Sequence, residues 1–143
     1  MKLIQVQQEA IEVMWPYVKE LLEKPTKRNS GEFDLEDVKS WLLHGQQVLW
    51  VVVEETKGIV LAATTELVTY PKQKRLRVVL VGAKTGTMSS WLEYCWNDSS
   101  PLSDYARLNK VDKFEIQGRE GWIRALFKHG FKKYLTILTK DVK

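Results

Sequence analysis

The stretch KFEIQGREGWIRALFKHGFKKYLTIL, residues 113–138, decides the fold that the sequence predicts. Its first residues alternate between apolar and polar types, as in a strand, and the alternation stops at Gly118. In REGWIRALFKH, apolar residues recur at the four-residue spacing of one helix face. Gly130 suits the position just after a helix, and a second alternating run follows it. The stretch therefore predicts a strand, a short helix and a closing strand over 131–138.

The residues before this stretch predict further helices and strands. Asp34 is a plausible N-cap for a helix that Gly45 stops, and Pro16 should kink or divide the helix before it. TKG between two Val-rich runs predicts a hairpin. In chain order we expect a strand over 2–6, a helix over 7–24, a helix after 34, strands over 47–55, 59–70 and 75–81, a helix from near Thr87 and a helical piece over 102–110.

This order predicts a fold of the α+β class, or loosely α/β. Three consecutive strands followed by a strand–helix–strand unit make a mixed, mostly antiparallel central sheet with helices on its faces. We find no internal repeat and no linker that would divide the chain. A chain of 143 residues is long enough to bury a core, so residues 1–143 are expected to form a single domain.

Composition limits the class of function. The single cysteine, Cys95, excludes an internal disulfide and suits a reducing compartment, and its neighbours make it look like a small buried residue. No apolar run reaches the length of a membrane span. We therefore expect a soluble, cytoplasmic protein that does not bind a membrane. The formal charge of +4 is too small to imply nucleic acid by itself, although the run 72–84 is basic.

The closing segment RALFKHGF resembles the last block of the GNAT acyltransferase family, in which a strand leads to a helix that ends in Gly-Phe. The order of elements along nearly the whole chain matches that family. More narrowly, FDLEDV, LWVVVEE, WLEYCW and IQGREGWIRALFKHGFK look like a GNAT-like group of tailed bacteriophages. The resemblance implies a single GNAT-like domain, acetyl-CoA as cofactor, and a place in the host cytoplasm or the virion.

In this family the cofactor's pyrophosphate rests on the loop that enters the central helix, where unpaired N–H groups favour an anion. The usual loop reads Gln/Arg-x-x-Gly-x-Gly/Ala, whereas this chain has VGAKTGTM and fits that pattern in neither register. Lys84, Thr85 and Thr87 could still hold a phosphate, the alternative being a solvated basic hairpin end. The resemblance implies these cofactor-binding residues: Val79, Val81, Gly82, Lys84, Thr85, Gly86 and Thr87.

The catalytic groups follow from the same resemblance. Thioester aminolysis needs a base for the amine, and many members place a glutamate on the central strand, where RLRVVLV has none. The next strand offers Glu115, and the hairpin offers Glu54 and Glu66. Glu115, which faces either a cleft or solvent, is our candidate base. Tyr134 is the candidate acid, with a packed ring as the alternative. Arg119 could contact an anion or form a local ion pair. No metal-ligand spacing is present.

Three functions therefore stay open. The first is an acetyl-CoA-dependent N-acetyltransferase with a degenerate cofactor loop. The second is a non-catalytic GNAT-like phage protein that acts through protein–protein contacts, either as a virion component or as a binder of a host factor. The third is a nucleic-acid binder that uses the run 72–84, which few aromatic residues interleave.

Overall fold

The computed structural model describes residues 1–29, 31–87, 93–118 and 121–142. The helix predicted from near Thr87 falls largely on residues outside this part of the chain. The elements are β1 (Lys2–Val6), η1 (Gln8–Ala10, a 3₁₀ turn), α1 (Ile11–Thr26), α2 (Leu35–Leu43), β2 (Val48–Glu54), β3 (Gly58–Tyr70), β4 (Gln73–Ala83), α4 (Pro101–Leu108), β5 (Lys113–Ile116) and α5 (Gly121–Phe127).

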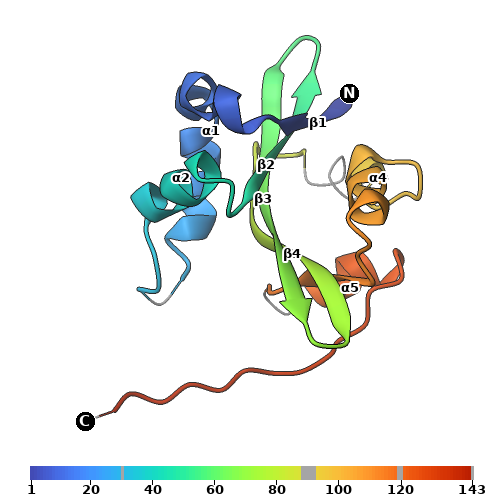
Figure 1. The fold of residues 1–143 in the computed structure, drawn as a ribbon. Coiled ribbons are helices and arrows are strands. Elements are labelled where there is room, and N and C mark those ends of the chain that lie inside the picture. The colour runs from blue at the N-terminus through green and yellow to red at the C-terminus, as the bar shows by residue number, and fades with distance from the viewer. Residues whose placement is uncertain (30, 88–92, 119–120, 143) are drawn as a thin grey trace.

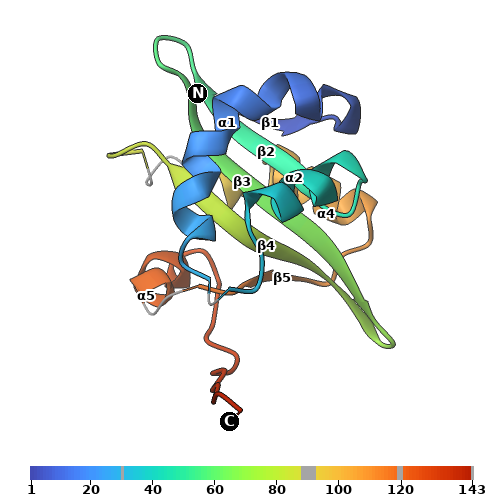
Figure 2. The same cartoon turned by 90° about the vertical axis from the view of Figure 1, so that its left-hand side faces the viewer.

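The five strands form one sheet in the order β1-β2-β3-β4-β5. The pairs from β1 to β4 are antiparallel. Short turns join β2 to β3 and β3 to β4, whereas η1, α1 and α2 lie between β1 and β2. β5 lies parallel to β4, from Arg75 opposite Lys113 to Val78 opposite Ile116. Figure 2 shows these strands side by side. The predicted α+β class and the mixed, mostly antiparallel sheet are confirmed.

Helices cover both faces of the sheet (Figure 1). We call the two sides the α1 face, which α1 and α2 cover, and the α4 face, on which α4 and α5 lie. Val18 and Leu22 of α1 pack on the α1 face in a cluster with Leu80 of β4. On the α4 face, Trp50 and Leu102 belong to a second cluster. Each strand thus buries alternate residues on opposite sides, which is what its sequence pattern predicts.

α1 shows what its internal proline does. Pro16 cannot donate the backbone hydrogen bond that would reach Glu12, yet α1 remains one helix from Ile11 to Thr26. Figure 2 shows its axis turning along its length. Pro16 therefore bends the helix without dividing it, because the side chains of Trp15 and Val18 stay buried on either side of it.

Two predicted helix ends are confirmed in detail. The Asp34 carboxylate accepts a hydrogen bond from the Asp37 amide at 3.0 Å, and the Asp37 carboxylate accepts one from the Asp34 amide at 3.0 Å. This reciprocal pair is a capping box. After α5, Gly130 has a φ of +88°, and the Phe131 amide donates to the Leu126 carbonyl at 3.4 Å. That pattern is a Schellman ending, with Gly130 in the position after the helix that the sequence predicts.

The predicted closing strand over 131–138 is wrong. Residues 131–142 have no helix or strand, and the last segment runs away from the sheet in Figure 1. An alternating sequence makes a strand only where another strand offers it unpaired backbone groups. β5 has four residues, and in the described part of the chain its only strand partner is β4. The alternation of 131–138 is therefore a strand pattern without a partner.

Gly82 lets α1 lie unusually close to β4. A Cβ built on Gly82 would lie 1.7 Å from the backbone oxygen of Leu21. One Cα hydrogen of Gly82 therefore points at this carbonyl, as in a weak C–H···O contact. Pro25 lies four residues after Leu21 in the helix and has no N–H to donate to it. The proline thus frees a carbonyl, and the glycine provides the space in which the strand contacts it.

Candidate functional site

The most distinctive feature of the sheet is the point where β4 and β5 part. Thr64 pairs with Leu80 and Thr65 pairs with Val78, so Val79 is an extra residue, a β-bulge in β4. The pairing between β4 and β5 ends at Val78. Beyond it, β4 continues to Ala83 without a strand on its β5 side among the described residues. The segment 79–83 is therefore an open edge, where backbone donors and acceptors face a gap between two strands.

The turn after β4 is held from within. The Thr87 amide donates to the Lys84 carbonyl at 3.1 Å, and Gly86 has a φ of +83° at the third position of this turn. That geometry is a type II turn, which favours glycine there. The buried Thr87 hydroxyl donates to the carbonyls of Lys84 at 2.6 Å and Val60 at 3.2 Å. Thr87 thus fastens the turn to β3 and does not present its hydroxyl to a ligand.

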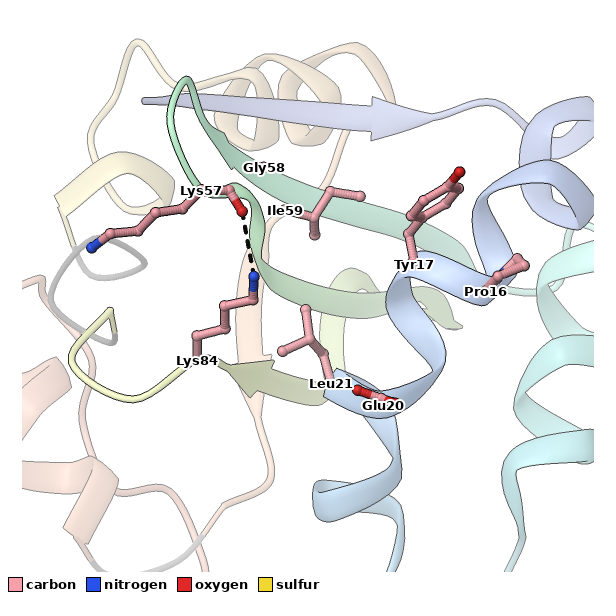
Figure 3. Close-up of a pocket in the computed structure, with 8 residues that line it drawn as sticks. All are labelled: Pro16, Tyr17, Glu20, Leu21, Lys57, Gly58, Ile59 and Lys84. Atoms are coloured by element: carbon pink, nitrogen blue, oxygen red, sulfur yellow. Dashed lines mark hydrogen bonds between the residues drawn. The ribbon is translucent and has the colours of Figure 1, made fainter.

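Lys84 and Thr85, in contrast, are exposed. The Lys84 ammonium makes a long hydrogen bond, 3.4 Å, to the backbone oxygen of Lys57 (Figure 3). It borders an open groove of about 500 Å³ between α1 and the β2–β3 turn, where Tyr17 and Ile59 form the apolar wall. A Cβ on Gly86 would meet nothing within 4 Å. The turn therefore offers an anion one flexible cation and an unobstructed stretch of backbone.

A polar row crosses the α1 face next to the bulge. It consists of Gln47, which directly precedes β2, and of Glu66, Arg77 and Glu115 on the neighbouring strands β3, β4 and β5. Glu66 pairs with Arg77 across β3 and β4, and Arg77 with Glu115 across β4 and β5. The Arg77 guanidinium donates to Glu66 at 3.0 Å and also to Glu115, and Arg75 donates to Glu115 at 2.8 Å. Both oxygens of Glu115 are thus held by arginines.

The charges around Glu115 decide its protonation. Burial pushes the pKa of Glu115 upward, but hydrogen bonds from Arg75 and Arg77 and their positive charges together hold this pKa below its ordinary value. A carboxylate with a lowered pKa, whose two oxygens already accept hydrogen bonds, is a weak base. The geometry therefore favours Glu115 as an organiser of the two arginines. Its role as the catalytic base stays a prediction.

Tyr134 lies beside Arg75, although it is not on a strand. The Arg75 guanidinium carbon is 4.9 Å from the ring centroid of Tyr134 and 5.2 Å from that of Tyr70. The rings of Tyr70 and Tyr134 thus both contact the Arg75 guanidinium, and cation–π attraction stabilises these contacts. Tyr134 remains 73% exposed. Tyr134 thus joins the C-terminal segment, residues 131–142, to Arg75 at the end of the polar row. Its role as an acid stays a prediction.

The structure brings some predicted residues together and leaves others apart. Val79, Val81 and Gly82 lie on the open edge, with Lys84 directly after it. Arg119 lies outside the described residues. Cys95 is buried, as expected, and burial raises the pKa of its thiol to about 12, which makes it a poor nucleophile. The cofactor and catalytic candidates therefore form two groups, one on each side of the bulge.

Sequence reasoning missed the role of Arg75 and Arg77. In RLRVVLV the two arginines alternate with apolar residues, which places both side chains on one face of β4. This alternation was the signal in the sequence that could have indicated their shared role. The partners Glu66 and Glu115 lie on other strands and neutralise them. The run 72–84 is consequently not a stripe of free positive charge, which weakens the nucleic-acid alternative.

The described residues hold neither a cluster of metal-ligand side chains nor a membrane-spanning helix. Across 1–29, 31–87, 93–118 and 121–142, no three His, Cys, Asp or Glu side chains come together as metal ligands would. In that part of the chain, no helix is both long and apolar enough to cross a membrane.

Solved structures of acetyltransferases share this architecture. An aminoglycoside acetyltransferase from an uncultured soil metagenomic sample, in complex with trehalose, has a TM-score of 0.69 at 11% identity, covering 99% of this chain and 96% of its own. A predicted acetyltransferase with acetyl-CoA, from Clostridium acetobutylicum, has a TM-score of 0.64 at 13% sequence identity, and the match covers 98% of this chain and 95% of that one. Glucosamine-6-phosphate N-acetyltransferase from Arabidopsis thaliana has a TM-score of 0.64 at 14% sequence identity, and the match covers 99% of this chain and 98% of that one.

No protein-family model and no curated protein sequence matches the chain. At 11–14% identity, likeness to these three structures establishes the fold and leaves the activity open. The similarity extends over nearly the full length of each chain, and the solved structures are acetyltransferases. The chain has the GNAT-like α+β fold of these acetyltransferases.

Proposed function

We propose that this protein binds acetyl-CoA along the open edge of β4 and transfers the acetyl group to an amine. The observation that carries the proposal is the parting of β4 and β5 at the Val79 bulge. It leaves the backbone of 79–83 free to pair with an extended ligand that contains amide groups, as a strand pairs with an edge. The pantetheine arm of coenzyme A has that chemistry.

The residues present fit this cofactor in two respects. The edge 79–83 supplies backbone donors and acceptors, and the turn 84–87 follows it directly, with Lys84 exposed and the space beside Gly86 open. Lys84 would therefore hold a phosphate group through its charge, and the backbone of Thr85 and Gly86 would lie beside it. Thr87 would contribute only by keeping the turn in shape. When bound, acetyl-CoA supplies an activated thioester carbonyl for attack by the amine.

The protein's part in the reaction is to position the amine and to accept its proton. The polar row lies on the α1 face next to the bulge, so an amine bound near Glu66 would be close to the open edge. Glu66 pairs with Arg77, so it would meet this amine as a hydrogen-bond acceptor and not as a free negative charge. Glu115 keeps Arg75 and Arg77 in position, and its further role as base, like that of Tyr134 as acid, is part of the proposal.

Calorimetry with acetyl-CoA tests the proposal. We expect a Kd in the micromolar range for the unaltered protein, weakened about tenfold by Lys84→Glu, because the substitution puts a negative charge next to the phosphates. Lys19→Glu is the matched control, since Lys19 is an exposed lysine on α1 that does not line the groove beside Lys84. It should bind like the unaltered protein. Absence of binding at about 1 mM acetyl-CoA would overturn the proposal.

A second function is favoured by a different observation. Thr87 and Glu115, two of the predicted site residues, are already engaged in internal contacts. A GNAT-like protein without catalysis would tolerate this, and it would act by binding a protein in the virion or the host. The sequence resemblance to a GNAT-like group of tailed bacteriophages supports this second proposal. It would place the protein in the virion or in the host cytoplasm. Stable binding of a virion protein without acetyl-CoA binding would favour it.

A further inference from the structure

The polar row on the α1 face opens to solvent at its centre. The side chains of Glu66 and Arg77 are 29% and 24% exposed, whereas that of Glu115 is 17% exposed. Gln47, at the other end of the row, is buried. Figure 2 looks onto this face, where β3 and β4 extend beyond α2. A small ligand that reaches the row from solvent would therefore meet Glu66 and Arg77 first.

Arg77 has a donor nitrogen that the row does not use. Its Nε donates to Glu115, and its Nη1 donates to Glu66 at 3.0 Å. Its Nη2, which carries two N–H groups, has no hydrogen-bond partner among the described residues. An arginine guanidinium can bind carboxylates on more than one side, because its donors point outward in a planar fork. Arg77 can therefore take a further carboxylate through Nη2.

Glu66 has an acceptor oxygen that is only weakly engaged. Its Oε1 accepts from Arg77, and its Oε2 accepts from the Gln47 amide over 3.5 Å, which is long for a hydrogen bond. The Oε1 atom of Gln47 is buried without a hydrogen-bond partner in the described part of the chain. A half-turn of this amide exchanges its nitrogen and oxygen, so both Glu66 and Gln47 can accept from one ammonium group.

The charges at this place are balanced. Glu66 and Glu115 carry two negative charges, and Arg75 and Arg77 carry two positive charges that are paired with them. A ligand with a single charge would compete with one of these ion pairs and offer nothing to the other partner. A ligand with an ammonium and a carboxylate can instead bind Glu66 and Arg77 together. The row therefore favours a ligand that carries both groups.

We propose that the acceptor of the acetyl group is a free α-amino acid, whose ammonium donates to Glu66 Oε2 and whose carboxylate accepts from Arg77 Nη2. Glu66 and Arg77 are paired on adjacent strands, about 5 Å apart, and their side chains converge on each other. The two charged groups of the ligand must therefore be close together, as they are when one carbon bears both. This inference rests on the proposed acetyl transfer and names its substrate class.

The transfer then conserves atoms and charge. The bound ammonium gives one proton to the catalytic base, and the neutral nitrogen bonds to the thioester carbonyl carbon while the carbon–sulfur bond breaks. A second proton leaves the nitrogen, and the thiolate that departs takes up one proton to become the coenzyme A thiol. The products are an N-acetylamino acid, coenzyme A and one proton. The carboxylate on Arg77 takes no part in these steps and only positions the amine.

Saturation-transfer NMR on the full chain, with coenzyme A present, tests the inference. The probes are the ordinary L-amino acids and their amides, which keep the ammonium and the side chain but lack the carboxylate. We expect at least one free amino acid to bind about tenfold more tightly than its amide, because the amide loses a hydrogen bond to a charged group. With acetyl-CoA in place of coenzyme A, mass spectrometry should find the same amino acid N-acetylated.

Arg77→Lys tests which residue holds the carboxylate. The lysine keeps a positive charge between Glu66 and Glu115, but one nitrogen replaces three and cannot serve both carboxylates and the ligand. The preference for the free amino acid should therefore fall to about twofold or less. Arg107→Lys is the matched control, because Arg107 lies on α4 and pairs there with Asp104. It should keep the preference, and circular dichroism confirms that both variants are folded.

The results separate this inference from the proposed function. Acetyl-CoA binding without binding of any amino acid would overturn the inference alone, and so would amides that bind as tightly as free amino acids. A preference that survives Arg77→Lys places the carboxylate elsewhere and overturns the contact with Arg77. If amino acids bind through Arg77 but acetyl-CoA does not bind, the proposed function fails and the amino acid is not an acceptor.

Discussion

Replacing Gly82 by alanine should destabilise the protein strongly although it adds one methyl group. The new Cβ would lie 1.7 Å from the Leu21 oxygen and 2.5 Å from the Leu21 carbonyl carbon. Both are backbone atoms in the middle of a helix, so no side-chain rotation relieves the overlap. The helix would have to move away by about 1.3 Å to restore the 3.0 Å that real Cβ atoms respect.

The magnitude follows from what that movement separates. Val18 and Leu22 of α1 are fully buried against the sheet, in one cluster with Leu80. A gap of about 1 Å forfeits a quarter to a half of the dispersion energy at each contact. Together with the usual cost of overpacking, we expect a loss of about 3 kcal/mol in the free energy of unfolding. That is a large share of the roughly 5–15 kcal/mol that stabilises an ordinary domain.

Urea unfolding followed by tryptophan fluorescence measures the loss, because Trp15 lies on α1. With a slope of about 2 kcal/mol/M, the midpoint of Gly82→Ala should fall by about 1.5 M. Gly121→Ala is the control: Gly121 opens α5, and a Cβ there meets nothing within 4 Å. It should change stability by less than about 1 kcal/mol, towards greater stability. A Gly82→Ala midpoint within about 0.3 M of the unaltered protein would refute this reasoning.

Three further predictions concern the helix cap, the polar row and the thiol. Asp34→Ala should cost about 1 kcal/mol of stability in urea unfolding, since it removes the capping bond to Asp37. Glu115→Gln should cost about 1–2 kcal/mol at neutral pH. Because the folded-state pKa of Glu115 is lowered, this difference should be present above the unfolded-state pKa and vanish as pH falls through the folded-state value; a difference that persists in acid would contradict it. Cys95, buried and with a raised pKa, should react with a thiol reagent at pH 8 only as fast as the protein unfolds, and rapid labelling of the native protein would show otherwise.

Local signals in the sequence predicted the helix ends well. A cap is decided by residues within a few positions of each other, such as Asp34 and Asp37, so the chain carries the whole interaction in one stretch. The same is true of Gly130, whose positive φ ends α5 where the sequence indicates. The β2–β3 hairpin also formed as expected from its short turn.

Contacts between distant residues could not be predicted in this way. Glu115 lies 40 residues from Arg75, and only the register of β4 against β5 brings them together. Thr87 turns its hydroxyl towards Val60, 27 residues away, which no loop pattern indicates. The segment 131–138 has the alternation of a strand, but whether it pairs depends on an edge elsewhere in the fold.

The bulge at Val79 links the packing of α1 to the candidate site. Val79 and Leu80 are consecutive and both pack on the α1 face, so the alternation of β4 shifts by one residue at this point. Without the shift, Val81 would face α1 where Gly82 now does, and its side chain would meet the Leu21 carbonyl. The same bulge lies where β5 leaves β4, so the glycine contact and the open edge depend on one irregularity. A change that removed the bulge would therefore turn Val81 towards the Leu21 carbonyl and displace α1 from the strand that carries the open edge.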